Sequence, residues 1–200
     1  MKPILMTLAL LSAVQLANAQ EQIPRKEALK IAFVLTADPT TLEGTPIPTD
    51  VDVKRPVAVK EGDYGAMVLP EAKLSADAIA KAGDKVLPLG QLWLHKLTPM
   101  RDGQAVSKDQ LRLVVLETGE GSATGVQCAL GVKANGSGDL ELLVYGKANT
   151  PVVKVPLKKA ENQQQLPITM TAERTDDAGK ITLKILGRYQ AIVPVTQLEL

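Results

Sequence analysis

Four things are scarce in this sequence: cysteine, histidine, aromatic residues and net charge. The 200 residues include one Cys and one His, aromatic residues make up 2%, and the formal net charge is +1. A single thiol cannot close a disulfide within its own chain, so packing must stabilise the fold. A single imidazole excludes metal sites that need two His ligands, and it leaves one candidate for a nucleophile-base pair.

The scarcity of aromatic residues and of excess charge also limits the partners. Stacking platforms for sugars, single-stranded nucleic acids or choline-like cations would have to be built from very few rings. Nucleic acids and anionic membranes are bound through a basic excess, which this chain lacks, so neither is an expected partner. The whole aromatic set is Phe33, Tyr64, Trp93, Tyr145 and Tyr189.

The N-terminus has the three zones of a secretory signal peptide. Lys2 supplies a positive charge, residues 4–16 are almost wholly apolar, and Ala17 and Ala19 place small residues before a cleavage site. The apolar run is about thirteen residues, whereas a membrane-spanning helix needs roughly twenty. We therefore predict that residues 1–19 are removed after Ala19, and that the mature chain is exported and has no transmembrane segment.

The residue after the predicted cleavage site bears on the compartment. Position 20 is Gln, so the Cys that a lipid anchor requires is missing there. Exported animal domains of small size often carry several disulfides, and their absence here favours a bacterial periplasm or extracellular space.

Period-two patterning dominates the mature chain. We predict a flexible leader over residues 20–28 and a single β-rich domain over 29–200, which begins with a strand at 29–36. An extended connection follows over 38–50. Val51, Val53, Val57 and Val59 then alternate with polar or small residues, as in a half-buried strand, and Pro56 indicates an edge or a bulge. Residues 61–65 form a turn into a partner strand at 66–69.

One helix is expected, over Ser75–Ala82, with Ser75 as N-cap and Gly83 as its end. The further predicted strands cover 85–97, with a bend at Pro88 and Gly90, then 111–117, 126–134, 139–145, 151–157, 166–174, 180–188 and 191–198. Residues 119–125 are expected to be a flexible loop, and the strand at 111–117 to be buried. In total about nine or ten strands, spaced roughly ten residues apart, predict an all-β, mainly antiparallel sandwich or partly open barrel.

Trp93 and His95 are the only candidate ligand-binding residues. They lie two positions apart in a predicted strand, so both side chains point to the same face. They could form a pocket with Trp93 as floor and His95 as polar group. The alternative is a structural or surface histidine beside a packing tryptophan, and the sequence leaves both open.

Other motifs have simpler interpretations. The glycine-rich loop 119–125 lacks the Lys of a phosphate-binding loop and leads into a strand rather than a helix. The acidic pairs at 50–52, 61–63 and 176–177 lack the spacing of a calcium loop. Asn135-Gly136 matches a hairpin turn better than a glycosylation site, and Cys128 is expected to be buried and inert. No catalytic residue, metal site or cofactor is predicted.

The sequence therefore favours a non-catalytic binding or structural module of the bacterial envelope or secretome. It could recruit a protein or another envelope component through an edge strand near 51–60 or 151–157. Two alternatives remain open: a secreted hydrolase that uses His95, and a carrier of a small apolar ligand held between sheet layers.

Overall fold

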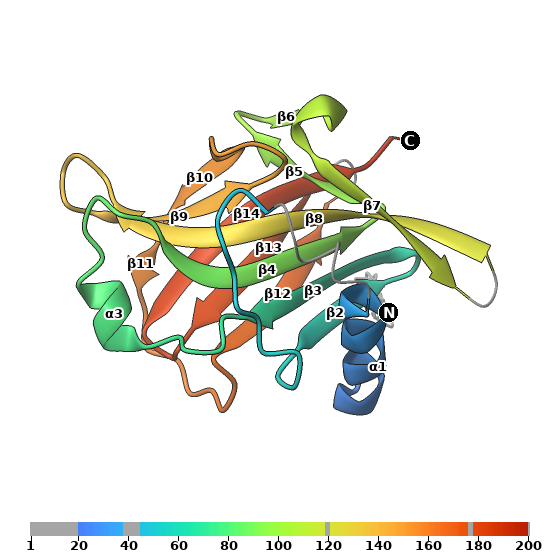
Figure 1. Ribbon diagram of the computed structural model, residues 1–200, viewed down its shortest axis with the longest axis horizontal. Coiled ribbons are helices and arrows are strands. Elements are labelled where there is room, and N and C mark those ends of the chain that lie inside the picture. The colour runs from blue at the N-terminus through green and yellow to red at the C-terminus, as the bar shows by residue number, and fades with distance from the viewer. Residues whose placement is uncertain (1–19, 38–44, 119–120, 176–177, 200) are drawn as a thin grey trace, which may run out of the picture.

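The computed structural model describes residues 20–37, 45–118, 121–175 and 178–199. Two antiparallel sheets pack face to face, and one helix lies against the outer face of the larger sheet (Figure 1). The prediction of an all-β, antiparallel sandwich is confirmed. The predicted signal peptide, residues 1–19, lies outside the described residues.

The larger sheet has eight strands. In spatial order they are β1 (Glu21–Gln22), β2 (Val57–Glu61), β3 (Tyr64–Pro70), β4 (Leu87–His95), β8 (Gly121–Ala134), β9 (Leu140–Tyr145) and β10 (Val153–Pro156), and β7 (Arg112–Thr118) pairs with the first half of β8.

The smaller sheet has six strands. They are β12 (Ile168–Arg174), β13 (Gly179–Ile185), β14 (Tyr189–Gln197), β5 (Leu97–Arg101) and β6 (Gln104–Ala105) in spatial order, with β11 (Lys158–Lys159) paired to β14. The chain passes between the sheets at Lys96, whose φ of 55° makes the corner between β4 and β5. It passes again at the buried Leu157, between β10 and β11.

The core between the sheets is formed by the residues that period-two patterning predicts. Val57 and Val59 of β2 are buried there, together with Ile181, Leu183 and Ile185 of β13. Val51 and Val53 are only half-buried, because the chain before Pro56 forms an isolated bridge and a turn rather than a strand.

The larger sheet is buried on its outer face too. Ala58, Met67, Leu69 and Trp93 form a second apolar cluster with residues of α1 (Arg25–Thr36). A third cluster joins Ala129, Leu143 and Tyr145 to Ile47 and Val86. Apolar residues on both faces explain why strands such as β4 and β9 have nearly continuous apolar sequences.

The predicted strand at 29–36 is wrong, because α1 occupies these residues. Ala28, Ala32 and Leu35 recur at helical spacing and are buried against the sheet. A short apolar run does not distinguish a strand from a helix by periodicity alone. The residues just before it, Arg25–Ala28, are strong helix formers, and Glu27 suits the first turn of a helix.

The flexible leader over 20–28 is also wrong. Glu21 and Gln22 pair with Lys60 and Val59 of β2, and α1 begins at Arg25. The Gln20 side chain adds a hydrogen bond, in which its Oε1 accepts from the Ala172 backbone N–H at 2.6 Å. The segment is therefore bound to both sheets.

Two further predictions fail around β7. Residues 121–125, expected in a flexible loop, are the first part of β8, because small residues with no strong turn signal can extend a strand as well as a loop. β7 pairs with β8 alone among the described strands, so it is an edge strand and not a buried one. Its Val115 is 61% exposed and its Leu113 40% exposed.

The other local predictions hold. The hairpins β2–β3, β8–β9 and β12–β13 form as expected. α3 (Ala76–Ala80) starts at Ser75, whose hydroxyl accepts from the Ala78 N–H, although it ends at Lys81 before Gly83. A short 3-10 helix, η1 (Lys108–Gln110), precedes β7. The pairing of β4 shifts between Pro88 and Gly90, where the sequence indicates a bend.

Candidate functional site

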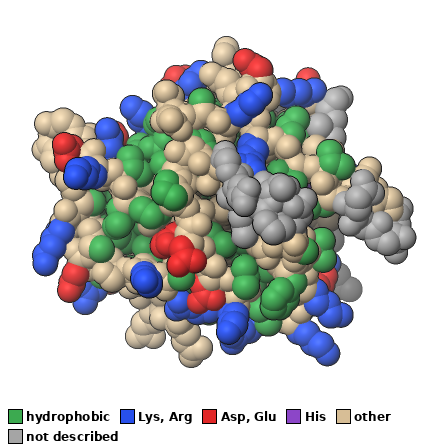
Figure 2. All heavy atoms as spheres, viewed as in Figure 1, with side chains coloured by type: hydrophobic (Ala, Val, Ile, Leu, Met, Phe, Trp, Pro, Cys, Tyr) green, Lys and Arg blue, Asp and Glu red, His purple; other side chains and the backbone are tan. Residues whose placement is uncertain are grey.

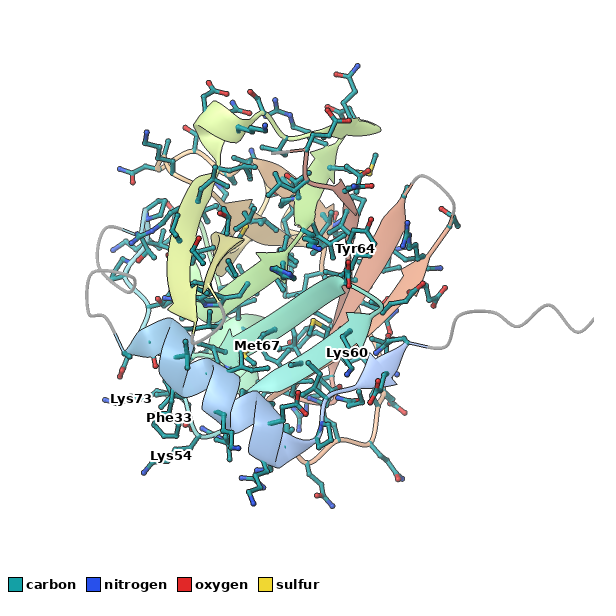
Figure 3. The ribbon with its side chains drawn as sticks, turned by 90° about the vertical axis from the view of Figure 1, so that its right-hand side faces the viewer. Phe33, Lys54, Lys60, Tyr64, Met67 and Lys73 are labelled. Atoms are coloured by element: carbon teal, nitrogen blue, oxygen red, sulfur yellow. The ribbon has the colours of Figure 1, made fainter. Side chains whose placement is uncertain are left out.

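A groove of about 440 Å³ lies between α1 and the outer face of the larger sheet. Met67 and Trp93 form its floor, and Ile31 and Leu35 of α1 stand on one side. Leu116 lines the groove from the β7–β8 hairpin. Figure 3 shows α1 crossing in front of β2 and β3, with Met67 beside it. The groove has the size and the mainly apolar lining of a small-molecule site.

The helix leaves room for this groove because small side chains anchor it. Ala28 and Ala32 contact the sheet without filling the space along the helix, and both are at most 1% exposed. Figure 2, drawn from the direction of Figure 1, shows hydrophobic side chains in patches on the surface, with Lys, Arg and some acidic side chains around them.

Both residues selected from the sequence line this groove. Trp93 is buried at its floor, and His95 is exposed at its rim, two residues further along β4. The groove thus brings the predicted pair together, but on the outside of the sandwich rather than between its layers. The role of Trp93 and His95 in ligand binding stays a prediction.

Two ion pairs lie on the rim near His95. Lys60 Nζ is 3.4 Å from Glu21 Oε2, and Lys96 Nζ is 3.1 Å from Asp63 Oδ2. Among the described residues, no carboxylate or hydroxyl group hydrogen-bonds to the His95 imidazole. The rim therefore carries one imidazole, His95, without a hydrogen-bond partner among the described residues, and two ion pairs beside it.

A buried amide network lies beneath the groove, and the sequence analysis missed it. Gln91 Oε1 accepts hydrogen bonds from Trp93 Nε1 at 3.1 Å and from Gln127 Nε2 at 3.0 Å. Gln91 Nε2 donates to Thr49 Oγ1 at 2.8 Å. The network fixes the Trp93 ring against the sheet. Its only signal in the sequence is a Gln inside each of two apolar runs.

The acidic segment 50–52 stabilises the loop around it. Burial alone would raise the pKa of Asp52, but hydrogen bonds from the Arg55 side chain and the Lys54 N–H outweigh burial and lower it. Burial raises the pKa of Glu71, which accepts from the Asp50 N–H. No group of three or more metal-ligating residues occurs in the parts of the chain that the structure describes. Asp176 and Asp177 lie outside them.

Cys128 and Asn135 behave as the sequence predicts. The Cys128 thiol is buried in the core between the sheets, and burial raises its pKa to about 12, so it stays protonated near neutral pH. Asn135 Oδ1 accepts from the Ser137 N–H at 2.9 Å and from the Asp139 N–H at 3.0 Å, which makes it a turn residue.

The chain was compared with protein-family models, with curated proteins and with solved structures. It matches none of them significantly. Within residues 20–37, 45–118, 121–175 and 178–199, no helix is long and apolar enough to cross a membrane.

Proposed function

We propose that this protein is an exported, non-catalytic binding module whose site is the groove between α1 and the larger sheet. The observation that carries the proposal is an apolar groove of about 440 Å³ with Trp93 on its floor and one imidazole on its rim. Export is inferred from the signal-like N-terminus, residues 1–19.

The ligand class follows from the lining. Met67, Trp93 and the α1 side chains favour a compact apolar ligand. Each Å² of apolar surface removed from water on binding would contribute about 25 cal/mol of favourable free energy. His95 favours one polar group on the ligand, such as a hydroxyl or an acid, at the solvent end. Hydrolysis at His95 is not proposed, because the described residues provide no hydrogen-bonded partner to activate it.

The experiment uses Trp93, the only Trp in the chain, as a reporter. Anilinonaphthalene sulfonate, a compact apolar probe with one acidic group, is titrated into the protein, and quenching of Trp93 emission is recorded together with probe emission. Saturable quenching is the expected result. No saturable change would contradict the proposal.

Gly65, beside His95 at the rim of the groove, allows a variant that blocks the groove. Gly65 lies opposite His95 on β3, and a Cβ there would be 3.7 Å from His95 Cβ, an ordinary contact. Gly65→Leu therefore places a side chain in the groove without backbone strain, and we expect at least about tenfold weaker binding of the probe. Gly136→Leu is the matched control, because Gly136 lies in the β8–β9 turn with no neighbour within 4 Å. Equal weakening by both variants would argue against the groove as the site.

A further inference from the structure

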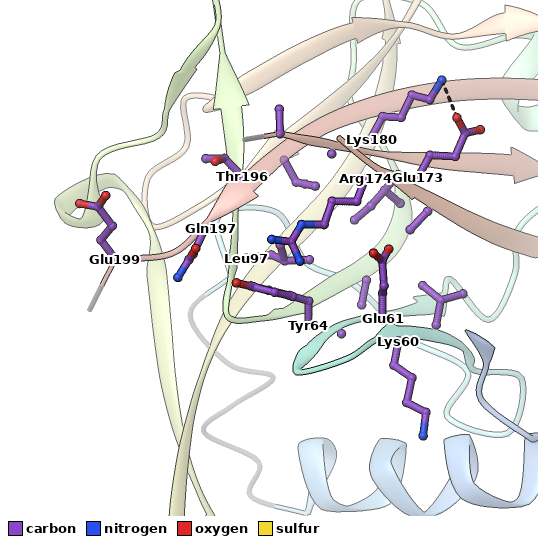
Figure 4. A pocket seen from close by; sticks show the side chains of 18 residues that line it. Lys60, Glu61, Tyr64, Leu97, Glu173, Arg174, Lys180, Thr196, Gln197 and Glu199 are labelled. Atoms are coloured by element: carbon purple, nitrogen blue, oxygen red, sulfur yellow. Dashed lines mark ion pairs between the residues drawn. The ribbon is translucent and has the colours of Figure 1, made fainter. Parts of the chain in front are cut away.

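A second pocket, of about 280 Å³, opens between the two sheets at one end of the sandwich. The turn of β2–β3 forms one wall, and the ends of β12, β13 and β14 form the other (Figure 4). Its inner lining is apolar and includes Ala66, Leu97 and Val195, whereas charged side chains surround the opening. It lies on the opposite side of the β2–β3 hairpin from the groove.

Arg174 is held at this opening by an aromatic ring from the other sheet. Its guanidinium carbon lies 4.4 Å from the centroid of the Tyr64 ring. Stacking on a ring orients the planar guanidinium and leaves its N–H groups free to donate in the plane, as bidentate binding of a carboxylate requires. None of the described acidic residues forms an ion pair with Arg174.

The acidic groups of the opening are not equivalent. Glu173 is neutralised by Lys180, with Oε2 and Nζ 2.8 Å apart. Glu61 also lines the pocket and has no ion-pair partner among the described residues. Figure 4 shows Glu61 and Arg174, which come from different sheets, lining the same pocket. Glu199 also lines the pocket and has no ion-pair partner among the described residues. The opening therefore presents one oriented cation, Arg174, and two carboxylates without an ion pair, of which Glu61 comes from the β2–β3 side.

We propose that this end pocket binds a compact zwitterion, an α-amino acid with an apolar side chain. Its carboxylate would pair with Arg174, its ammonium group with Glu61, and its side chain would enter the apolar part of the pocket. A ligand with only one of these charges would form one of the two charge-assisted contacts and lack the other, which weakens its binding.

The test compares three probes with the same side chain and different charged groups: L-leucine has both charges, N-acetyl-L-leucine only the carboxylate, and L-leucinamide only the ammonium group. Each is titrated into the isotope-labelled full-length mature protein, and the backbone amide signals of Ala172, Arg174 and Ile181, which line the end pocket and not the groove, are followed by NMR. We expect saturable shifts with leucine at a dissociation constant of about 1 mM. We expect binding at least about tenfold weaker for each blocked analogue. Absence of saturable shifts with leucine overturns the proposal, and equal binding of the three probes overturns recognition of a zwitterion.

Two variants test which protein charge binds which charged group of the ligand. Arg174→Gln should weaken leucine and N-acetyl-leucine alike, whereas Glu61→Gln should weaken leucine and leave N-acetyl-leucine unchanged. Arg188→Gln, an exposed arginine that does not line the pocket, is the matched control and should bind leucine as the wild type does. Loss of leucine binding in the control would contradict the assignment.

This proposal is independent of the groove. Trp93 lines the groove and not the end pocket, so leucine should leave its emission unchanged. Failure of leucine to bind leaves the groove proposal intact, and failure of the apolar probe leaves this one intact.

Discussion

At the scale of single residues, Gly90 is the position that the fold constrains most. It sits at the register shift of β4 with a φ of 131°, and a Cβ built on it would lie 2.1 Å from the Leu69 carbonyl oxygen. Both the backbone conformation and the space require glycine. Proline and glycine in an apolar run indicate such a bend in the sequence, but not which backbone carbonyl comes so close.

Gly90→Ala is expected to destabilise the protein by about 3 kcal/mol, because the new methyl group meets backbone that cannot move aside easily. Urea denaturation monitored by far-UV circular dichroism measures this change. Gly136→Ala, at a turn with open space around it, should change stability by less than about 0.5 kcal/mol. Similar stabilities of Gly90→Ala and wild type would show that the bulge is not constrained as described.

In the candidate sites, contacts within one strand can be predicted from the sequence, whereas contacts between strands cannot. Trp93 and His95 lie on one face of β4, as their spacing predicts, because residues two positions apart in a strand share a face whatever the rest of the fold does. Their role in ligand binding stays a prediction. The contact of Arg174 with Tyr64 joins residues from different sheets, and the Gln91–Gln127 hydrogen bond joins different strands. Both depend on sheet order, which local patterning does not specify.

At the scale of elements, α1 is held by side chains of unusually small size. Ala32 is fully buried against the sheet, whereas Phe33 beside it is 56% exposed. The larger apolar residue therefore points to solvent, which helps explain why the sequence suggested a strand with both faces buried.

Ala32→Leu tests this packing. Three added carbon atoms at a closed contact should cost about 1–3 kcal/mol, and lifting the helix should admit water to Trp93 and shift its emission to longer wavelength. Phe33→Ala is the control and should alter stability by less than about 0.5 kcal/mol. An unchanged Trp93 spectrum in Ala32→Leu would mean that α1 does not rest on the sheet as described.

Hairpins were the most predictable elements, and the reason is local. Asn135-Gly136 and the turn at Gly62 each have the chemistry of a tight turn between alternating segments, so strand pairing and register follow from neighbouring residues. The exposure of β7 depends instead on β9, which pairs with only the second half of β8, so that no further strand continues the sheet beyond β7 in the described parts of the chain. That is a property of the sheet, which the apolar sequence of β7 does not reveal.

At the scale of the whole molecule, the first residue of the expected mature chain is already part of the fold. Gln20 hydrogen-bonds to Ala172 of the smaller sheet, and Glu21 and Gln22 extend the larger one. Expression with the natural N-terminus in a bacterium that exports proteins should therefore yield a secreted chain that begins at Gln20. The intact mass measures the cleavage point, and a product that retains residues 1–19 would refute the export proposal.

Apolar clusters lie on both faces of the larger sheet, so burial of apolar side chains alone does not select the correct register of its strands. In a sheet with one solvent-exposed face, a shift of one strand by one residue moves its apolar side chains into solvent and is therefore unfavourable. Here such a shift would move apolar side chains from one buried face of the sheet to the other. The hydrogen bond between the Gln91 and Gln127 side chains distinguishes the two alignments, because a slipped β4 or β8 would move an amide among the leucines of the core with no partner. Those two glutamines therefore help to fix the register of β4 and β8, whose other apolar side chains would be buried on either face.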